Sequence, residues 1–202
     1  LEALVNALVF ERVIVPIDVE PDPRVTGVHA GDSGHNPIDF VRVQTPAGEA
    51  LAIYSSVRAL SAHRPGDRPM ALDFRTIGLT ALIETGGRVV VNPGTDAVLL
   101  PRPAVAALAQ GDQWLPAWRD VALRDLLFDE ANAVCSAITD LSITYAGGGL
   151  TRVIVSVERS CFTEAANASA MKQSLTQALS HVGANRRLIA SADRVEIAPI
   201  LV

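Results

Sequence analysis

The sequence predicts an α/β (α+β) fold in two packed halves, and three observations lead to this class. Short β-branched runs, such as residues 12–20 and 89–91, alternate with stretches whose apolar residues recur at helical spacing. Hydrophobic residues make up 49% of the chain but aromatic residues only 4%, so Ala, Val, Leu and Ile must build the core. At 202 residues, the chain is long enough for one domain or two small ones.

The first half, residues 1–112, is predicted to be a mixed sheet with helices. Leu1, Leu4, Leu8 and their neighbours give a helical apolar stripe, and the β-branched run over 12–20 indicates a strand. A loop rich in Pro and Gly follows. The remaining expectations are a hairpin formed by residues 39–45 and 50–56, a short helix capped by Ser55 or Ser56, and a helix that begins at Asp73 and stops at Gly86 and Gly87.

The stretch from Val89 to Asp112 raises the question of a phosphate site. A strand at residues 89–91 is followed by the turn "NPGTD", a second apolar run and a helix that Pro101 or Pro103 opens. Phosphate loops place several glycines and a Lys or Ser/Thr directly before a helix, whereas prolines here remove the N–H donors. The turn is therefore interpreted as a corner in the fold.

The second half, residues 113–202, leaves two topologies open. Gly111 to Asp120, which carries both tryptophans, is typical of a linker. If Val121 to Phe128 is a strand, the order is βαββαβ and ferredoxin-like; if it is a helix, the order is α-β-β-α-β. In both cases we expect a helix at about Glu130 to Ile138, a hairpin turning at Gly147 to Gly149, and later elements consisting of a long helix that ends near Gly183 and a final strand from Arg194.

Charge and composition exclude several classes of protein. Seventeen Lys and Arg against 22 Asp and Glu give a net charge of -5, opposite to that of a general nucleic-acid binder. No apolar run reaches the ~20 residues of a membrane span, and the first residues do not resemble a signal peptide, so we expect a cytoplasmic protein. Cys135 and Cys161 belong to no Cys/His cluster and are interpreted as structural thiols.

Two tempting motifs in the Pro/Gly-rich loop do not support a chemistry. "GDSG", residues 31–34, matches the tetrapeptide around a trypsin-like nucleophile, but too little chain precedes Ser33 for that fold. His29, Asp32 and His35 lack a further rigid ligand for a metal. We therefore predict no catalytic residues, no metal and no cofactor.

Six residues remain as surface candidates. His63, Arg64, Asp67 and Arg68 form a polar connection between a helix and a strand, and a cleft holding His63 with Asp67 or Arg68 would favour an enzyme. Trp114 and Trp118 flank a proline, and their rings would mark a partner surface if exposed or a packing plug if buried.

The succession of motifs between residues 51 and 112 resembles a known family. "SSVRAL" (55–60), "VVVNPG" (89–94) and "LPRPAVAAL" (100–108) resemble the SseB family of bacterial proteins, named for enhanced serine sensitivity. The first 18 residues and the closing "RVEIAPILV" are also similar, so the likeness covers most of the chain. The chain departs at His63, where many relatives show Trp. The resemblance implies no catalytic residues.

The function expected from these patterns is a non-catalytic cytoplasmic binding or regulatory module. Its partner would be another protein or a second copy, through a sheet edge or the surface near the tryptophans. The serine connection and the possible ferredoxin-like half leave open a small-molecule sensor for amino acids. An enzyme whose site is assembled only in the fold is the third alternative.

Overall fold

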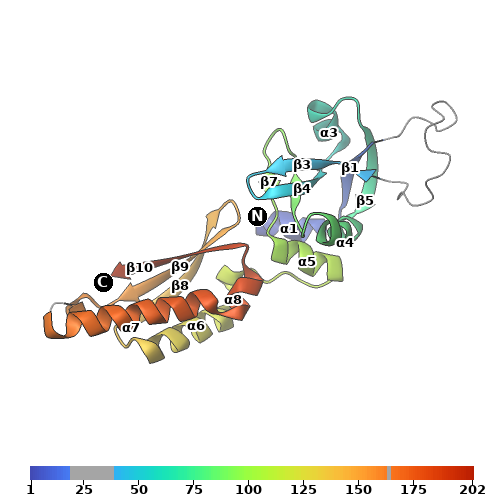
Figure 1. Cartoon of the computed structure of the whole chain (residues 1–202). Coiled ribbons are helices and arrows are strands. Elements are labelled where there is room, and N and C mark those ends of the chain that lie inside the picture. The colour runs from blue at the N-terminus through green and yellow to red at the C-terminus, as the bar shows by residue number, and fades with distance from the viewer. Residues whose placement is uncertain (19–38, 163–164) are drawn as a thin grey trace, which may run out of the picture. The chain divides into compact units, whose positions relative to one another are not determined.

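The computed structural model describes residues 1–18, 39–162 and 165–202, and Figure 1 shows its helices and strands. The chain divides into two compact units, Leu1–Gln113 and Trp114–Val202. Both units contain helices and strands, so the predicted α+β class is confirmed. The predicted loop, with "GDSG", His29 and His35, lies outside the described residues.

Unit 1 contains two sheets where one was expected. The strand order is β2-β1-β5 in the first sheet, which is antiparallel throughout, and β3-β4-β6-β7 in the second, which is mixed because β4 and β6 run parallel. A bridge between Ile14 and Tyr54 links the two sheets. The strands are β1 (Arg12–Asp18), β2 (Asp39–Phe40), β3 (Arg42–Thr45), β4 (Gly48–Ile53), β5 (Arg68–Asp73), β6 (Val89–Val91) and β7 (Val98–Leu99).

The strand expected over residues 39–45 is divided at Val41. Phe40 pairs with Ile17 of β1, whereas Val43 pairs with Ala50 of β4, so the chain crosses from one sheet to the other. The carbonyl of Val41 still accepts the Ala52 N–H at 3.1 Å. The predicted hairpin is confirmed for β3 and β4. Residues 39–40 pair with β1 instead and form the separate strand β2.

The helices of unit 1 are α1 (Glu2–Leu8), α3 (Val57–His63), α4 (Phe74–Glu84) and α5 (Arg102–Gln110). Ser56 caps α3 as expected, its Oγ accepting the Ala59 N–H at 3.1 Å. Asp73 is the residue before α4, although its carboxylate makes no capping hydrogen bond. Gly87, at φ +81°, donates its N–H to Ala81 at 2.7 Å where α4 ends.

The core of unit 1 lies between its second sheet and the helices α4 and α5. Residues 50–53 of β4 and all of β6 are buried, and α4 and α5 lie side by side in Figure 1. A Cβ added at Gly78 of α4 would lie 3.0 Å from the Ala109 Cβ of α5, so the two helices approach closely here.

Unit 2 is a three-stranded sheet with helices against it. The strand order is β10-β9-β8, with β8 and β9 antiparallel and β9 and β10 parallel. Gly147, Gly148 and Gly149 all have positive φ, as the predicted hairpin requires. The elements are η1 (Ala117–Arg119), α6 (Val121–Val134), β8 (Ile138–Gly147), β9 (Leu150–Val157), η2 (Arg159–Phe162), α7 (Ala165–Ala184), α8 (Arg186–Ser191) and β10 (Arg194–Leu201).

The run from Val121 to Phe128 is a helix, so the order is α-β-β-α-β and the ferredoxin-like alternative is wrong. Leu123, Leu127 and Ala131 are fully buried at a spacing of four residues, which places them on one helical face. The helix expected at Glu130 to Ile138 is the end of the same α6, and Ile138 already belongs to β8.

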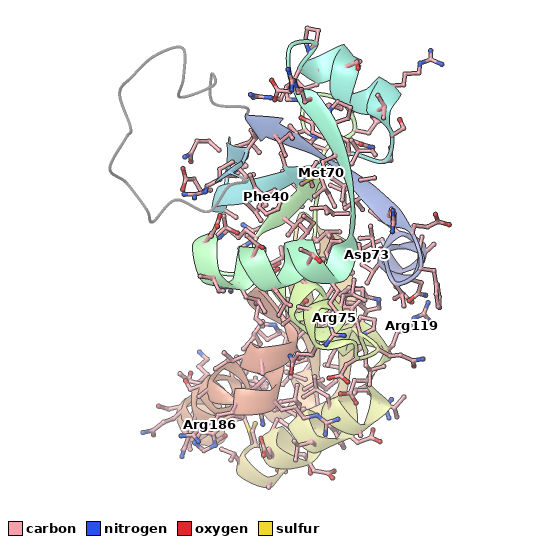
Figure 2. All side chains as sticks on the ribbon, turned by 90° about the vertical axis from the view of Figure 1, so that its right-hand side faces the viewer. Phe40, Met70, Asp73, Arg75, Arg119 and Arg186 are labelled. Carbon is pink, nitrogen blue, oxygen red and sulfur yellow. The ribbon has the colours of Figure 1, made fainter. Side chains whose placement is uncertain are left out.

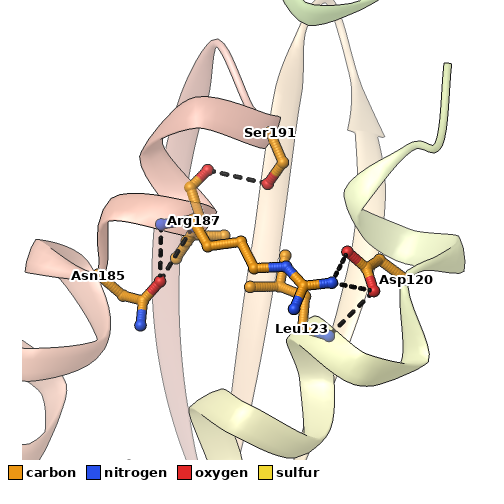
Figure 3. Close-up of polar contacts among 6 residues, drawn as sticks. Asp120, Leu123, Asn185, Arg187 and Ser191 are labelled. Carbon is orange, nitrogen blue, oxygen red and sulfur yellow. Dashed lines mark hydrogen bonds and ion pairs between the residues drawn. The ribbon is translucent and has the colours of Figure 1, made fainter. Parts of the chain in front are cut away.

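Asp120 fixes the start of α6 and joins it to α8, as Figure 3 shows. Its Oδ1 accepts the Leu123 N–H at 3.0 Å, and both its oxygens accept from Arg187 Nη2, at 2.9 and 2.7 Å. Asn185 caps α8 through the N–H groups of Arg187 and Leu188. One carboxylate thus satisfies a helix terminus and an ion pair together.

The core of unit 2 lies between the sheet and the helices α6 and α7. It includes Cys135, which is buried with its Sγ 3.7 Å from Met171 Sδ, and Cys161 packs at its margin. Both cysteines are free thiols. None of the helices in the described part of the chain combines the length and the apolarity that crossing a bilayer requires.

Candidate functional site

Polar residues follow the carboxyl ends of the parallel strands β4 and β6. Tyr54 and Ser55 come after β4, Asn92 and Gly94 come after β6, and His63 ends the helix that begins beside them. We call these five residues the β4–β6 edge. Ligands of sheets with parallel strands commonly bind at the carboxyl ends of the strands, which makes this edge the first candidate.

Asn92 holds the two strand ends together. Its N–H donates to the Ile53 carbonyl at 2.8 Å, and its Oδ1 accepts the Ser55 N–H at 2.9 Å. Its Nδ2 lies 3.1 Å from Ser55 Oγ. Asn92 has φ +50°, a conformation that Asn tolerates better than most residues. The side-chain amide of Asn92 is thus engaged by Ser55, and the turn connects β6 to its neighbour β7. This agrees with the interpretation of the turn as a corner in the fold.

His63 is exposed at this edge but held by two neighbours. Its Nδ1 lies 2.8 Å from the hydroxyl of Tyr54, a residue that is only 1% exposed. The imidazole also covers Gly94 so closely that an added Cβ would lie 2.2 Å from His63 Cδ2. Burial raises the pKa of Tyr54, while the charge of Arg64 lowers it and that of Asp67 raises it.

The other charged candidates form a separate pair beside His63. Arg64 Nε donates to Asp67 Oδ2, and the turn between them is closed by the Asp67 N–H, 3.2 Å from the Arg64 carbonyl. Arg68 begins β5 opposite Ile17 and is exposed. His63 thus pairs with Tyr54 and Asp67 with Arg64, so the hydrogen bonds and ion pairs of the described residues do not join His63 and Asp67 in one acid–base set.

The two tryptophans pack together within unit 2. Their ring centroids lie 5.5 Å apart in an edge-on arrangement, and Trp118 lies 4.8 Å from Tyr145 of β8. Trp118 packs against the core, and Trp114 Nε1 is buried without a hydrogen-bond partner among the described residues. Residues 114–119 therefore belong to the second unit rather than to a free linker.

A further surface, which the sequence analysis did not identify, lies on α4. Leu79, Leu82 and Ile83 project from the helix at i, i+3 and i+4, and their exposed fractions are 48%, 39% and 87%. We call these three residues the α4 strip. The only signal in the sequence was that apolar residues of this helix occupy more than one face, which a buried helix would also show.

Within residues 1–18, 39–162 and 165–202, no three His, Cys, Asp or Glu side chains come close enough to hold an ion. The loop residues His29, Asp32 and His35 are not among those described, so that hypothesis is not tested by the structure.

Comparison with known families decides where the chain belongs. Residues 1–107, more than half of the chain, match the SseB protein N-terminal domain. The chain belongs to the SseB family. No curated protein and no solved structure matches it significantly. The SseB match contains both the β4–β6 edge and the α4 strip, whereas residues 113–202 remain an SseB-like C-terminal domain by prediction only.

Proposed function

We propose that this SseB-family chain is a non-catalytic, cytoplasmic binding module of a bacterium, and that it docks a protein partner on the α4 strip. The observation that carries this function is the exposure of three neighbouring apolar side chains on a helix whose opposite face is already buried. Single exposed apolar residues are common, but a set at i, i+3 and i+4 is the pattern by which helices recognise other helices.

The energy available at such a surface supports a specific contact. Complete burial of a Leu or Ile side chain contributes about 1.5–3 kcal/mol. Ile83 is 87% exposed, so nearly all of its contribution is still available to a partner. The strip therefore has the character of a small binding centre.

The edges of the unit 2 sheet are less suited to docking. Val202 donates its N–H to Val157 and its carbonyl accepts the Arg159 N–H, so alternate residues of β10 face β9 and Pro199 faces outward. A proline at an outward position removes a donor that an added strand would need. On β8, Trp118 of η1 packs against Tyr145.

Photo-crosslinking tests the α4 strip directly. We would replace Ile83 with p-benzoylphenylalanine and, as a matched control, Ile189 of α8, which is 56% exposed. The proposal expects a discrete protein adduct from position 83, diminished by Leu79→Ser, and none from position 189. Equal labelling at both positions, or no adduct from position 83, would contradict it.

A second candidate function is an amino-acid sensor, and the β4–β6 edge favours it. This edge offers an exposed imidazole next to the Ser55–Asn92 pair at the ends of parallel strands. A ligand at ~100 times its Kd adds about 2.7 kcal/mol to stability. We expect millimolar serine to raise the Tm if this function holds, and an unchanged Tm with all amino acids would exclude it.

The third alternative, an enzyme assembled in the fold, gains less support. His63 is engaged with Tyr54, and Asp67 is engaged with Arg64. The Tyr54 contact uses only Nδ1 of His63 and leaves Nε2 able to act as a base, but no hydrogen bond or ion pair among the described residues joins the imidazole to Asp67 or Arg68. These pairings support binding over acid–base catalysis at the predicted residues.

A further inference from the structure

The α4 strip is flanked by arginines that α4 and α5 contribute. Arg75 lies where α4 meets α5, its Nε donating to the Ala109 carbonyl at 3.2 Å (Figure 2). At the other end of α4, Leu82 and Arg102 are neighbours beside Gly87. A Cβ added at Gly87 would lie 3.4 Å from Leu82 Cδ2 and 3.7 Å from the aliphatic carbons of Arg102. An arginine residue therefore lies near each end of the apolar strip.

The outer face of α6 has the complementary character. Leu123, Leu127 and Ala131 bury the inner face. On the opposite side the exposed residues are small, apolar or acidic, and Leu126 is 37% exposed. The members of this α6 face are Ala122, Asp125, Leu126, Asp129 and Ala133.

We propose that the partner on the α4 strip is a second copy of this chain, which presents its α6 face. The inference rests on the proposed function and names its partner. Leu126 and the two alanines would cover Leu79, Leu82 and Ile83, because small side chains let two helices approach closely. Asp129 would face Arg75, which sets the register of the contact. Asp125 already pairs with Arg124 of its own helix, so Asp129 is the carboxylate to test.

Charge reversal in two separate variants gives a specific test. Arg75→Glu places a carboxylate opposite Asp129 of the second copy, and Asp129→Arg places two guanidinium groups opposite each other. Each variant alone would lose association. In a one-to-one mixture, the carboxylate introduced at position 75 of one copy meets the guanidinium introduced at position 129 of the other. In the same mixture, Arg75 of the Asp129→Arg variant can still pair with Asp129 of the Arg75→Glu variant, as in the wild-type contact.

Sedimentation velocity on the full chain over about 1–200 µM would measure the result. We expect the wild-type chain to associate with rising concentration, each variant to weaken association on the order of tenfold or more, and the mixture to restore it. The control Ile189→Ser should associate like the wild type, and far-UV circular dichroism would verify that every variant is folded.

Two outcomes would overturn the inference. One is a wild-type chain that stays monomeric at every concentration, and the other is a mixture of folded variants that associates no better than either alone. A monomeric chain that still forms an adduct with another protein from position 83 would refute the second copy but leave the proposed function standing. A monomer without any adduct would refute both.

Discussion

At the β4–β6 edge, position 94 requires glycine for two reasons: its backbone has a positive φ, and the imidazole of His63 leaves no room for a Cβ. It has φ +90°, and a Cβ would lie 2.2 Å from His63 Cδ2. We expect Gly94→Ala to lower the free energy of unfolding by about 1–2 kcal/mol from backbone strain, and further because His63 must move. Urea unfolding would measure this.

The same substitution in a His63→Ala background separates the two causes. The backbone strain remains there, whereas the clash with the imidazole is gone, so the loss from Gly94→Ala should be smaller. Equal losses in the two backgrounds would show that the imidazole yields freely and that Gly94 does not position it.

The buried phenol of Tyr54 should make the free energy of unfolding depend on pH in the alkaline range. Burial raises the pKa of its phenol above the ordinary 10.0, so the unfolded chain releases this proton first. Its contribution is fully present below pH 10 and is lost as the pH rises through the folded-state pKa. Urea midpoints from pH 8 to 11 should fall more steeply above pH 10 for the wild type than for Tyr54→Phe.

The Tyr54→Phe variant also has a cost at neutral pH, which serves as its baseline. Loss of the hydroxyl contact with His63 should cost about 0.5–1.5 kcal/mol, because water can replace the partner at the exposed imidazole. Midpoint curves that stay parallel through pH 11 would mean that the phenol ionises equally in both states.

At the scale of elements, Asp120 should be worth more to unit 2 than its partner Arg187. Asp120→Ala removes the α6 cap and the ion pair, an expected loss of about 1–2 kcal/mol. Arg187→Ala removes only the ion pair, in which the arginine is half-exposed, and should cost about 0–1 kcal/mol. Thermal unfolding of both variants and of Asp120→Asn, which keeps an acceptor for the cap, would rank the contributions.

Elements defined by local chemistry could be predicted from the sequence, and those defined by distant pairing could not. Ser56 caps α3 and three glycines turn the β8–β9 hairpin, because caps and turns depend on neighbouring residues. Val121 to Phe128 fits a buried strand as well as a helix, and only the packing of Leu123 and Leu127 decides.

The candidate sites show the same limit. The pairing of His63 with Tyr54 crosses nine positions and depends on how α3 packs, through Leu60, against Tyr54. The α4 strip is exposed because the opposite face of the helix, which includes Gly78 and Ala81, packs into the core and against α5. Hydrophobicity alone assigns Leu79, Leu82 and Ile83 to a core, so the sequence could not mark them as a surface.

At the scale of the whole molecule, each unit has its own core, and both tryptophans of the chain lie in unit 2. Tryptophan fluorescence should therefore report the unfolding of unit 2, whereas far-UV circular dichroism reports helices and strands of both units. If the units differ in stability, the two probes will give different urea midpoints. The isolated fragment of residues 114–202 should then reproduce the fluorescence midpoint of the full chain, because Trp114, Trp118 and Tyr145 all lie within it. Two results would mean that the units depend on each other for stability. One is a fragment that does not unfold cooperatively. The other is a full chain whose two probes give the same urea midpoint while the midpoint of the fragment differs from it.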